Sequence, residues 1–398
     1  MSQKVNLTLH NNISDILRRL EAAGFEAYAV GGYVRDGLMG RTAGDCDITT
    51  SALPDETKAV FSDLRTIDTG IKHGTVTVLY GGEPYEITTY RVDGEYADNR
   101  HPDEVSFTAS LEEDLARRDF TVNAMAYSDS RGLVDLFSGR EDLSARIIRA
   151  VGEPERRFTE DALRMLRALR FASVLDFEIE EYTRAAIFSL WERIKSVSAE
   201  RILTELRKLF SGVGAHRVLK EYSPLIVQLL SGLENISLPT EEIFDSMSPE
   251  NRLVALFYLS SDTPSEAFSS AMRALHSDRR TERHGVALLE IMRADLSGDR
   301  LYRAVLDYGA DTMREALALR ALLCGGETTL ARLDNALKSG FSGAISDLEI
   351  DGRAILSLGY SGARVGEILA ALAIAVMSGE TQNDRVSLTE YIKKIPLA

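Results

Sequence analysis

Residues 27–50 read AYAVGGYVRDGLMGRTAGDCDITT, and this stretch decides the fold of the first part of the chain. Ala27–Val30 is a short apolar run that ends at a Gly-Gly pair. Tyr33–Met39 is compatible with a short helix that stops at Gly40, because glycine is common just after a helix. Asp45–Thr49 alternates sides as a strand does. The pattern predicts a strand, a glycine turn, a short helix and a second strand.

Each part of this unit has a use in nucleotide chemistry. Gly31 and Gly32 let the backbone approach a ligand, and the N-terminus of the following helix turns N–H groups toward an anion. Arg35 adds a forked cation that suits phosphate. Asp45 and Asp47 are two residues apart on the expected strand, so both project from one face, where paired carboxylates suit Mg²⁺. A triphosphate cradle beside a two-carboxylate metal site predicts nucleotidyl transfer.

Taken singly, these features are weak signals. Glycine pairs mostly make simple turns, and exposed strand carboxylates are common. The prediction depends on their conjunction. Glu86, on the second strand of an expected hairpin, is a candidate third carboxylate, and a solvated strand position explains it about equally well.

The composition is that of a soluble globular protein. The 398 residues suggest about two to four domains, and 44% hydrophobic and 27% charged residues are ordinary values. A net charge of −15 argues against a surface that is basic throughout, although arginines cluster locally. Two distant cysteines, Cys46 and Cys324, fit a reducing cytoplasm. We expect no signal peptide, and the longest apolar run, Ile368–Met377, is too short to span a membrane.

The periodicity predicts strands and helices in the first part of the chain. Residues 12–23 carry apolar side chains at helical spacing, and Pro54–Leu64 is also typical of a helix. Gly74–Tyr80 and Tyr85–Tyr90 are rich in β-forming residues and flank GGEP, which indicates a hairpin. Arg91–Pro102 is polar and rich in Asp, Asn, Gly and Arg, so we expect a mobile loop.

After Gly152 the strand signals vanish and helical patterns run almost to the end. Thr159 is a plausible N-cap for a helix over Glu160–Leu175. Gly298–Leu323 is a second long helical segment. The predicted fold class is therefore α+β, with a mixed head followed by a longer all-helical remainder.

Two charged motifs remain. In Arg117-Arg118-Asp119, apolar residues follow a charge triplet, and phosphate would supply partners for Arg118 as it enters the core. Asp161 and Arg164 are three apart on the expected helix and are therefore neighbours. The simplest interpretation of Asp161 and Arg164 is an ordinary ion pair within one helix.

The second motif can also read bases. A carboxylate only accepts hydrogen bonds and a guanidinium only donates them. Cytosine and adenine present a donor beside an acceptor that match Asp161 and Arg164, whereas guanine and uracil present the reverse pattern. Opposed groups are costly, so this pair would reject G and U.

With these motifs assembled, the chain resembles the class II tRNA nucleotidyltransferases, the CCA-adding enzymes, which share a family with bacterial poly(A) polymerases. The resemblance is carried by five motifs, which begin at Gly31-Gly32-x-Val34-Arg35, Arg117-Arg118-Asp119, Asp135-Leu136-Phe137, Glu160-Asp161 and Ser198. The chain has no adjacent His-Asp pair, which indicates the short bacterial form without an HD domain.

The resemblance implies a polymerase-β-like nucleotidyltransferase head at 1–151, a nucleotide-selecting neck at 152–212, a body at 213–300 and a tRNA-binding tail at 301–398. It implies two Mg²⁺ ions held by Asp45 and Asp47, with Glu86 as a further catalytic candidate. The implied nucleotide-binding residues are Gly31, Gly32, Arg35, Arg118, Asp119, Asn123, Glu160, Asp161, Arg164, Arg167 and Arg170.

The expected reaction is stepwise addition of C, C and A to the tRNA 3′ end from CTP and ATP, with no nucleic-acid template. The partners would be the acceptor end and elbow of tRNA, with no membrane, and the protein would be a cytoplasmic monomer or homodimer. The loop at 91–102 resembles one that CC-only enzymes shorten, which argues against that subtype. An A-adding enzyme or a poly(A) polymerase of the same family stays open. A small-molecule nucleotidyltransferase or an inactive RNA-binding protein is a more distant alternative.

Overall fold

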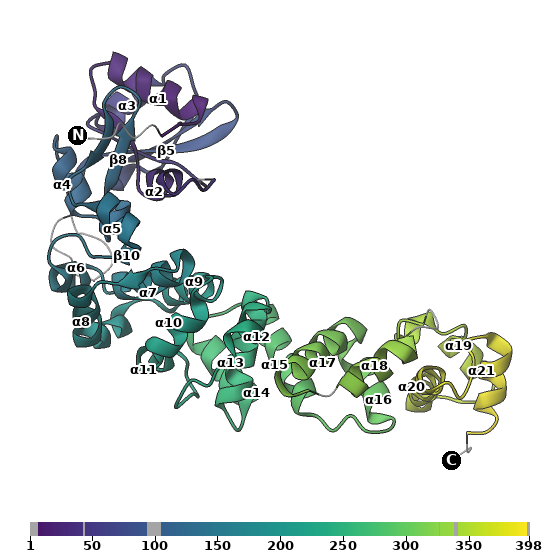
Figure 1. Cartoon of the computed structure of the whole chain (residues 1–398). Helices are drawn as coiled ribbons and strands as arrows, with labels where there is room; N and C mark the ends of the chain where they lie inside the picture. Colours follow the sequence, from purple (N-terminus) through teal and green to yellow (C-terminus); the bar gives the residue numbers. More distant parts are fainter. Residues whose placement is uncertain (1–6, 43, 94–104, 326, 338–340, 396–398) are drawn as a thin grey trace. The chain divides into compact units, whose positions relative to one another are not determined.

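The computed structural model describes residues 7–42, 44–93, 105–325, 327–337 and 341–395 (Figure 1). The chain divides into two compact units, residues 1–225 and residues 226–398. The first unit contains a sheet and helices, and the second is helical in its described residues. The predicted α+β class is confirmed. The division into head, neck, body and tail stays a prediction.

The first unit is built on a mixed sheet in which seven described strands have the order β3-β4-β5-β2-β1-β8-β9. β2 and β5 run parallel, and the other neighbours run antiparallel. The strands are β1 (Ala27–Val30), β2 (Asp47–Thr50), β3 (Thr66–Gly70), β4 (Thr75–Tyr80), β5 (Glu83–Thr89), β8 (Met125–Ser128) and β9 (Gly132–Asp135).

The predicted strand–turn–helix–strand unit is present, with one shift. β1 and the helix α2 (Gly32–Leu38) lie where the sequence places them, but β2 begins at Asp47, so Asp45 precedes the strand. The hairpin β4–β5 turns at Gly81 and Gly82, whose φ angles are 61° and 87°. Positive φ at two central residues is the geometry that suits a two-residue hairpin.

The two faces of the sheet have different roles. One face buries apolar side chains such as Ala29, Ile48 and Ile87 beneath α1 (Asn11–Ala22), α2 and α3 (Pro54–Val60). The opposite face carries Asp47 and Glu86, because alternate residues of a strand point to opposite sides. The helix α4 (Leu111–Ala116) packs on this second face, near Tyr28 and Tyr90. The polar face therefore lies on the side of α4.

The rest of the first unit is mainly helical, with short extended pieces. The prediction that strands end before residue 152 was wrong in one detail, because β10 (Ile147–Ile148) pairs in parallel with β11 (Glu178–Ile179). The remaining elements are η1 (Ile71–His73), β6 (Arg91–Asp93), β7 (Val105–Phe107), η2 (Thr121–Asn123), α5 (Gly139–Ala145), α6 (Pro154–Glu160), α7 (Leu163–Leu175), α8 (Glu181–Leu190), η3 (Trp191–Ser196), α9 (Ala199–Phe210), α10 (Ala215–Glu221) and, reaching the second unit, α11 (Ser223–Ile226).

The second unit consists of helices in its described residues. The expected helical segment over Gly298–Leu323 consists of two helices, α16 (Arg300–Tyr308) and α17 (Ala310–Cys324), which meet at Gly309, where φ is 81°. The others are η4 (Val227–Leu229), α12 (Glu241–Asp245), α13 (Pro249–Ser260), α14 (Pro264–Ala274), α15 (Arg279–Arg293), α18 (Glu327–Leu337), η5 (Ile345–Asp347), α19 (Gly352–Ser357), α20 (Ala363–Ser378) and α21 (Arg385–Ile392).

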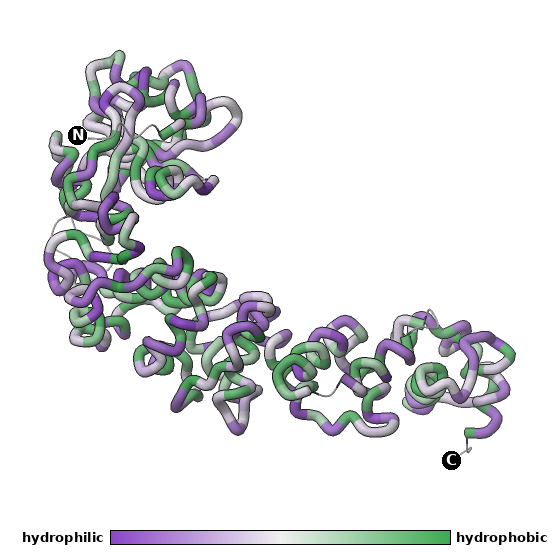
Figure 2. The backbone as a smooth tube through the Cα atoms, viewed as in Figure 1, coloured by the Kyte–Doolittle hydropathy of each residue, from purple (hydrophilic) through white to green (hydrophobic). Residues whose placement is uncertain are grey.

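Hydrophobic and hydrophilic residues interchange in short blocks along the tube (Figure 2). The apolar run Ile368–Met377 lies in α20, where Ile368, Leu372 and Val376 are buried. Among the described residues, no helix is both long and apolar enough to cross a membrane.

Candidate active site

A cavity of about 410 Å³ in the first unit collects most of the residues that the sequence singled out. Its walls come from the glycine turn before α2, the start of β2, the segment between α4 and η2, and the α6–α7 region. The lining residues are Gly31, Gly32, Arg35, Asp47, Arg117, Arg118, Asp119, Asn123, Asp161, Arg164, Arg167, Arg170 and Phe171. Three predicted site residues, Asp45, Glu86 and Glu160, do not line this cavity.

The glycine turn allows a close approach of two side chains. Gly31 has a φ of 68° just before α2, a conformation that residues with a side chain rarely adopt. A Cβ at Gly31 would lie 3.3 Å from Nη1 of Arg118, so this guanidinium packs on bare backbone. Arg35 is buried; it forms an ion pair with Asp36 and donates from Nη1 to Oδ1 of Asn123 at 2.6 Å. The turn thus places two cations at the cavity.

Asp47 and Glu86 are direct partners in the parallel pair β2–β5, so their side chains leave the same face of adjacent strands. Asp45 is exposed and lies two residues before Asp47. Burial raises the pKa of Asp47, and nearby Asp45 adds to this, while Arg118 acts in the opposite direction. A cation beside Asp47 would favour the charged carboxylate and so lower the pKa of Asp47.

These acidic residues fit a divalent cation in part. In the described part of the chain, Asp45, Asp47 and Glu86 make no ion pair or side-chain hydrogen bond with another residue. Also among the described residues, no three His, Cys, Asp or Glu side chains come close enough to form a complete metal site. A cation at Asp45 and Asp47 would therefore take further ligands from phosphate or water, which is the usual arrangement for Mg²⁺.

The prediction that Asp161 lies inside a helix starting at Glu160 was wrong. Helix α6 ends at Glu160, and Asp161 has extended backbone angles (φ −142°, ψ 106°). Its carboxylate accepts a hydrogen bond from the backbone N–H of Leu163 at 3.0 Å. The same carboxylate forms an ion pair with Arg201 at 2.8 Å. Asp161 and Arg164 both line the cavity, and the backbone N–H of Arg164 donates to the carbonyl of Asp161 at 3.0 Å. The side chain of each is held by other residues.

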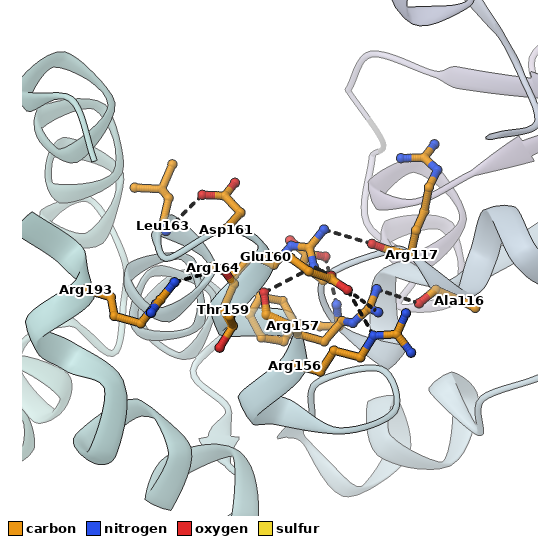
Figure 3. A network of polar contacts seen from close by, with 12 residues as sticks. Ala116, Arg117, Arg156, Arg157, Thr159, Glu160, Asp161, Leu163, Arg164 and Arg193 are labelled. Carbon is orange, nitrogen blue, oxygen red and sulfur yellow. Dashed lines mark hydrogen bonds and ion pairs between the residues drawn. The ribbon is translucent and has the colours of Figure 1, made fainter. Parts of the chain in front are cut away.

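Figure 3 shows how Arg164 is held. Its Nη1 contacts Oε2 of Glu160 at 2.9 Å, and its Nη2 donates to the backbone carbonyl of Arg117 at 3.0 Å. Arg157 also pairs with Glu160 and donates to the carbonyl of Ala116 at 3.1 Å. The end of α4 therefore receives two guanidinium groups from α6 and α7, where carbonyls carry partial negative charge. Glu160 therefore holds Arg157 and Arg164 in place without lining the cavity itself.

Arg164, Arg167 and Arg170 follow one another along α7, and we call them the arginine wall. Arg167 donates from Nε and Nη2 to Oδ2 of Asp119 at 2.9 and 2.6 Å. Burial would raise the pKa of Asp119, but Arg167 and Asn123 outweigh it and hold this pKa at about 2. Asp119 is thus a fixed anion that orients the wall.

The far end of the wall is held by Glu205 and Phe171. Glu205, buried on α9, lies 3.5 Å from Arg167 and 2.7 Å from Arg170. The guanidinium carbon of Arg170 lies 3.6 Å from the ring centre of Phe171, and that of Arg35 lies 5.3 Å away. Burial lowers the pKa of Arg170 to about 10, and Arg167 acts in the same direction. Positive charge in such a pocket favours a polyanion such as a triphosphate.

Comparisons with known proteins show the family to which the chain belongs. The family described as the Poly A polymerase head domain matches residues 27–149, and the one described as a probable RNA and SrmB-binding site of polymerase A matches residues 176–223. The chain is 40% identical to the CCA-adding enzyme of Lactobacillus helveticus over 389 residues, which cover 96% of each protein. The CCA-adding enzyme of Lactobacillus delbrueckii subsp. bulgaricus is 37% identical over 385 residues, which cover 95% of this chain and 96% of the relative. This chain belongs to the CCA-adding enzyme family.

Solved structures of the family share the fold. The Bacillus stearothermophilus CCA-adding enzyme in complex with CTP matches with a TM-score of 0.77 at 31% identity, over 96% of this chain and 97% of that one. The Thermotoga maritima enzyme complexed with tRNA matches with a TM-score of 0.69 at 21% identity, over 97% and 95% of the two chains, which shows the fold alone. The resemblance read from the motifs is confirmed, and the chain is a nucleotidyltransferase. Polymerase-type nucleotidyltransferases generally use a divalent metal.

Two buried acids and one aromatic residue of this CCA-adding family member were missed by sequence reasoning. Asp114 holds two cavity arginines, Glu205 holds the arginine wall, and Phe171 lies beneath it. The spacing of Asp114, three and four residues before Arg117 and Arg118, was an available signal, because side chains so spaced are neighbours on a helix. Glu205 ends the motif that begins at Ser198, but no spacing linked it to these arginines, because it reaches them from another helix.

The expected mobile loop at Arg91–Pro102 lies largely outside the described residues. Arg91–Asp93 forms β6, which pairs antiparallel with β7. Residues 94–102 belong to the part that the structure does not describe.

Proposed function

We propose that this chain adds C, C and A to the 3′ end of tRNA from CTP and ATP, with the site residues in the roles given below. The observation that carries the proposal is the single cavity where Asp47 of β2, Arg118 and the α6–α7 pair Asp161 and Arg164 meet. Family membership supports the reaction class. The cavity supports the division of labour among the residues.

The triphosphate would lie against the cavity arginines. Arg118, Arg167 and Arg170 present guanidinium groups that suit phosphate oxygens, and Phe171 and the buried acids fix their positions. Asp45 and Asp47 would hold Mg²⁺, which would neutralise phosphate charge and favour the ionised 3′ hydroxyl. Glu86 would assist from the neighbouring strand.

The reaction itself needs little covalent help from the protein. The 3′ hydroxyl oxygen of the tRNA forms a bond to the α-phosphorus, the bond from the α-phosphorus to pyrophosphate breaks, and the hydroxyl proton passes to solvent water. Positioning and charge stabilisation provide the catalysis. Arg35, Asn123 and Asp119 form one connected set that would orient the sugar of the incoming nucleotide.

Base choice would rest on Asp161 and Arg164. Asp161 only accepts and Arg164 only donates, so together they match the edges of C and A and oppose those of G and U. Asp161 is fixed by Arg201 and Leu163, and Arg164 by Glu160 and Arg117. Side chains that are held in place discriminate between bases better than side chains that can move to accommodate the wrong base.

For the rest of the chain, we propose the domain roles expected from the sequence, with the tail at 301–398 binding the tRNA elbow. tRNA affinity should fall steeply with salt, since arginines would displace counterions from phosphate. We also propose a cytoplasmic protein, monomer or homodimer, in keeping with the free thiols of Cys46 and Cys324.

The test is an end-extension assay. Purified protein is incubated with CTP, ATP and Mg²⁺ and with either a tRNA lacking CCA or a tRNA ending in CC, and the 3′ ends are sequenced. Addition of C, C and A, and no more, is the expected result. Addition of A only to tRNA ending in CC would indicate an A-adding enzyme, and long A tails would indicate a poly(A) polymerase. No extension by wild-type protein, with no pyrophosphate released, would reject the proposal.

A further inference from the structure

Asp114 is a buried carboxylate that binds two cavity arginines and has no role of its own in the reaction described above. It lies on α4, outside the cavity lining, with a side chain that is 0% exposed. A buried charge is costly unless it is paired, so its partners indicate what it does. Burial would raise the pKa of Asp114, but Arg117 and Arg118 keep it below the ordinary value.

The partners of Asp114 come from separate parts of the head. Oδ1 accepts from Nε and Nη2 of Arg117 at 3.0 and 2.8 Å, and Oδ2 accepts from Nη2 of Arg118 at 3.3 Å. Oδ2 also accepts from Oγ1 of Thr49 at 3.2 Å, and Oδ1 from the backbone N–H of Arg91 at 3.4 Å. Thr49 lies on β2, two residues after Asp47. One carboxylate therefore joins the arginine pair to the strand that carries Asp47.

Arg118 is held from two directions. Its Nη2 faces Asp114, and its Nη1 lies over Gly31, where a Cβ would be 3.3 Å away. Arg118 and Asp47 line the same cavity, so the charge of Arg118 acts near the strand carboxylate. If Asp114 lost its charge, Arg117 and Arg118 would keep their length and flexibility but lose their common anchor.

We propose that Asp114 is a positioning residue for nucleotidyl transfer, which fixes Arg117 and Arg118 against β2 in the orientation that receives the triphosphate. The inference rests on the proposed function, because it takes the cavity arginines as the triphosphate site. Asp114 would act through the arginines and touch neither substrate.

The test is Asp114→Asn, which keeps the shape and removes the charge. Steady-state kinetics on tRNA lacking CCA should show KM for CTP and for ATP raised by about 10-fold. kcat/KM should fall on the order of 100-fold for both nucleotides, because small displacements of positioning groups are costly. KM for tRNA and the preference for C and A over G and U should stay unchanged. Equal nucleotide KM values in the variant and the wild type would overturn the proposal.

A double-mutant cycle separates positioning from general damage. In an Arg118→Ala background, Asp114→Asn should lower kcat/KM by clearly less than the roughly 100-fold expected in wild type, because one of its two target arginines is already gone. Full additivity would overturn the proposal. Asp142→Asn is the matched control: it too removes a buried carboxylate paired with an arginine, Arg149, but it should leave nucleotide KM unchanged.

Two further outcomes are covered. If Asp114→Asn does not fold, Thr49→Val keeps the charge and removes one anchor, and it should raise both nucleotide KM values roughly 3-fold; unchanged values would count against Asp114. If wild-type protein itself adds no C or A, the proposed function fails. If wild type is active and Asp114→Asn matches it, only this inference fails.

Discussion

The two sides of the cavity are built on opposite principles. On the sheet side, Asp47 lines the cavity, Asp45 lies two residues before it, and Glu86 is its partner on β5. All three are exposed, and they make no ion pair in the described part of the chain. On the helix side, Arg164, Arg167 and Arg170 are each tied to an acid, namely Glu160, Asp119 and Glu205. The described acids of the sheet side have no paired cation, whereas the arginines are held by acids of the protein itself.

This difference indicates how the two sides contribute to catalysis. A preorganised cation costs no reorganisation when charge develops on the phosphates. A carboxylate pair without protein partners can take a cation together with the nucleotide. Damage to the sheet side should therefore affect chemistry more than folding, and damage to the helix side should affect both.

The largest effect is expected from Asp47→Asn. Incorporation of C should fall by on the order of 1000-fold or more, because the phosphate charge loses its counter-cation. CTP binding, measured by equilibrium titration, should change much less, since the arginine wall remains. Asp68→Asn, on β3 and paired with Lys58, is a control that should keep activity. An active Asp47→Asn protein would remove Asp47 from the proposed cation site.

The next effect is a loss of base choice in Asp161→Ala. Discrimination against UTP should fall by roughly 10- to 100-fold, because the penalty for opposed groups disappears. Competition assays with mixed nucleotides measure this ratio. Asp161→Asn separates choice from folding, because its amide oxygen can still accept from the N–H of Leu163. If UTP stays excluded in both variants, the base is read elsewhere.

The same contrast explains what the sequence could and could not predict. The sheet side is local: a glycine turn and two acids within residues 27–50 follow from short-range rules. The helix side depends on the break at Asp161, which side-chain periodicity did not reveal because Glu160 and Leu163 both fit a continuous helix. It also depends on Glu205, which reaches the wall from α9, and such long-range pairs leave no spacing signal in one sequence.

A third prediction concerns pH and the helix side. Asp119 has a pKa of about 2 when folded, against an ordinary value of 3.8. A lowered pKa stabilises the fold above about pH 4, and this contribution is lost as pH falls toward 2. The shift corresponds to about 2 kcal/mol of unfolding free energy. The unfolding free energies of wild type and Asp119→Asn, measured with urea, should differ by this full amount at pH 6. The difference should shrink below pH 4. A gap that does not change with pH would show that Asp119 stabilises through packing instead.

The smallest expected effect, Glu86→Gln, tests how far the sheet side extends. Glu86 is the direct partner of Asp47, and adjacent strands lie about 4.8 Å apart, so its longer side chain can reach a cation at Asp47. Since the described acids do not form a complete metal site, its contribution should be modest: kcat reduced by about 10-fold or less, with a higher Mg²⁺ requirement. Glu83→Gln is the matched control, because Glu83 lies three residues earlier on β5 and points to the other face. If both variants keep wild-type kcat and Mg²⁺ dependence, Glu86 is a solvated strand residue and the sheet side consists of Asp45 and Asp47 alone.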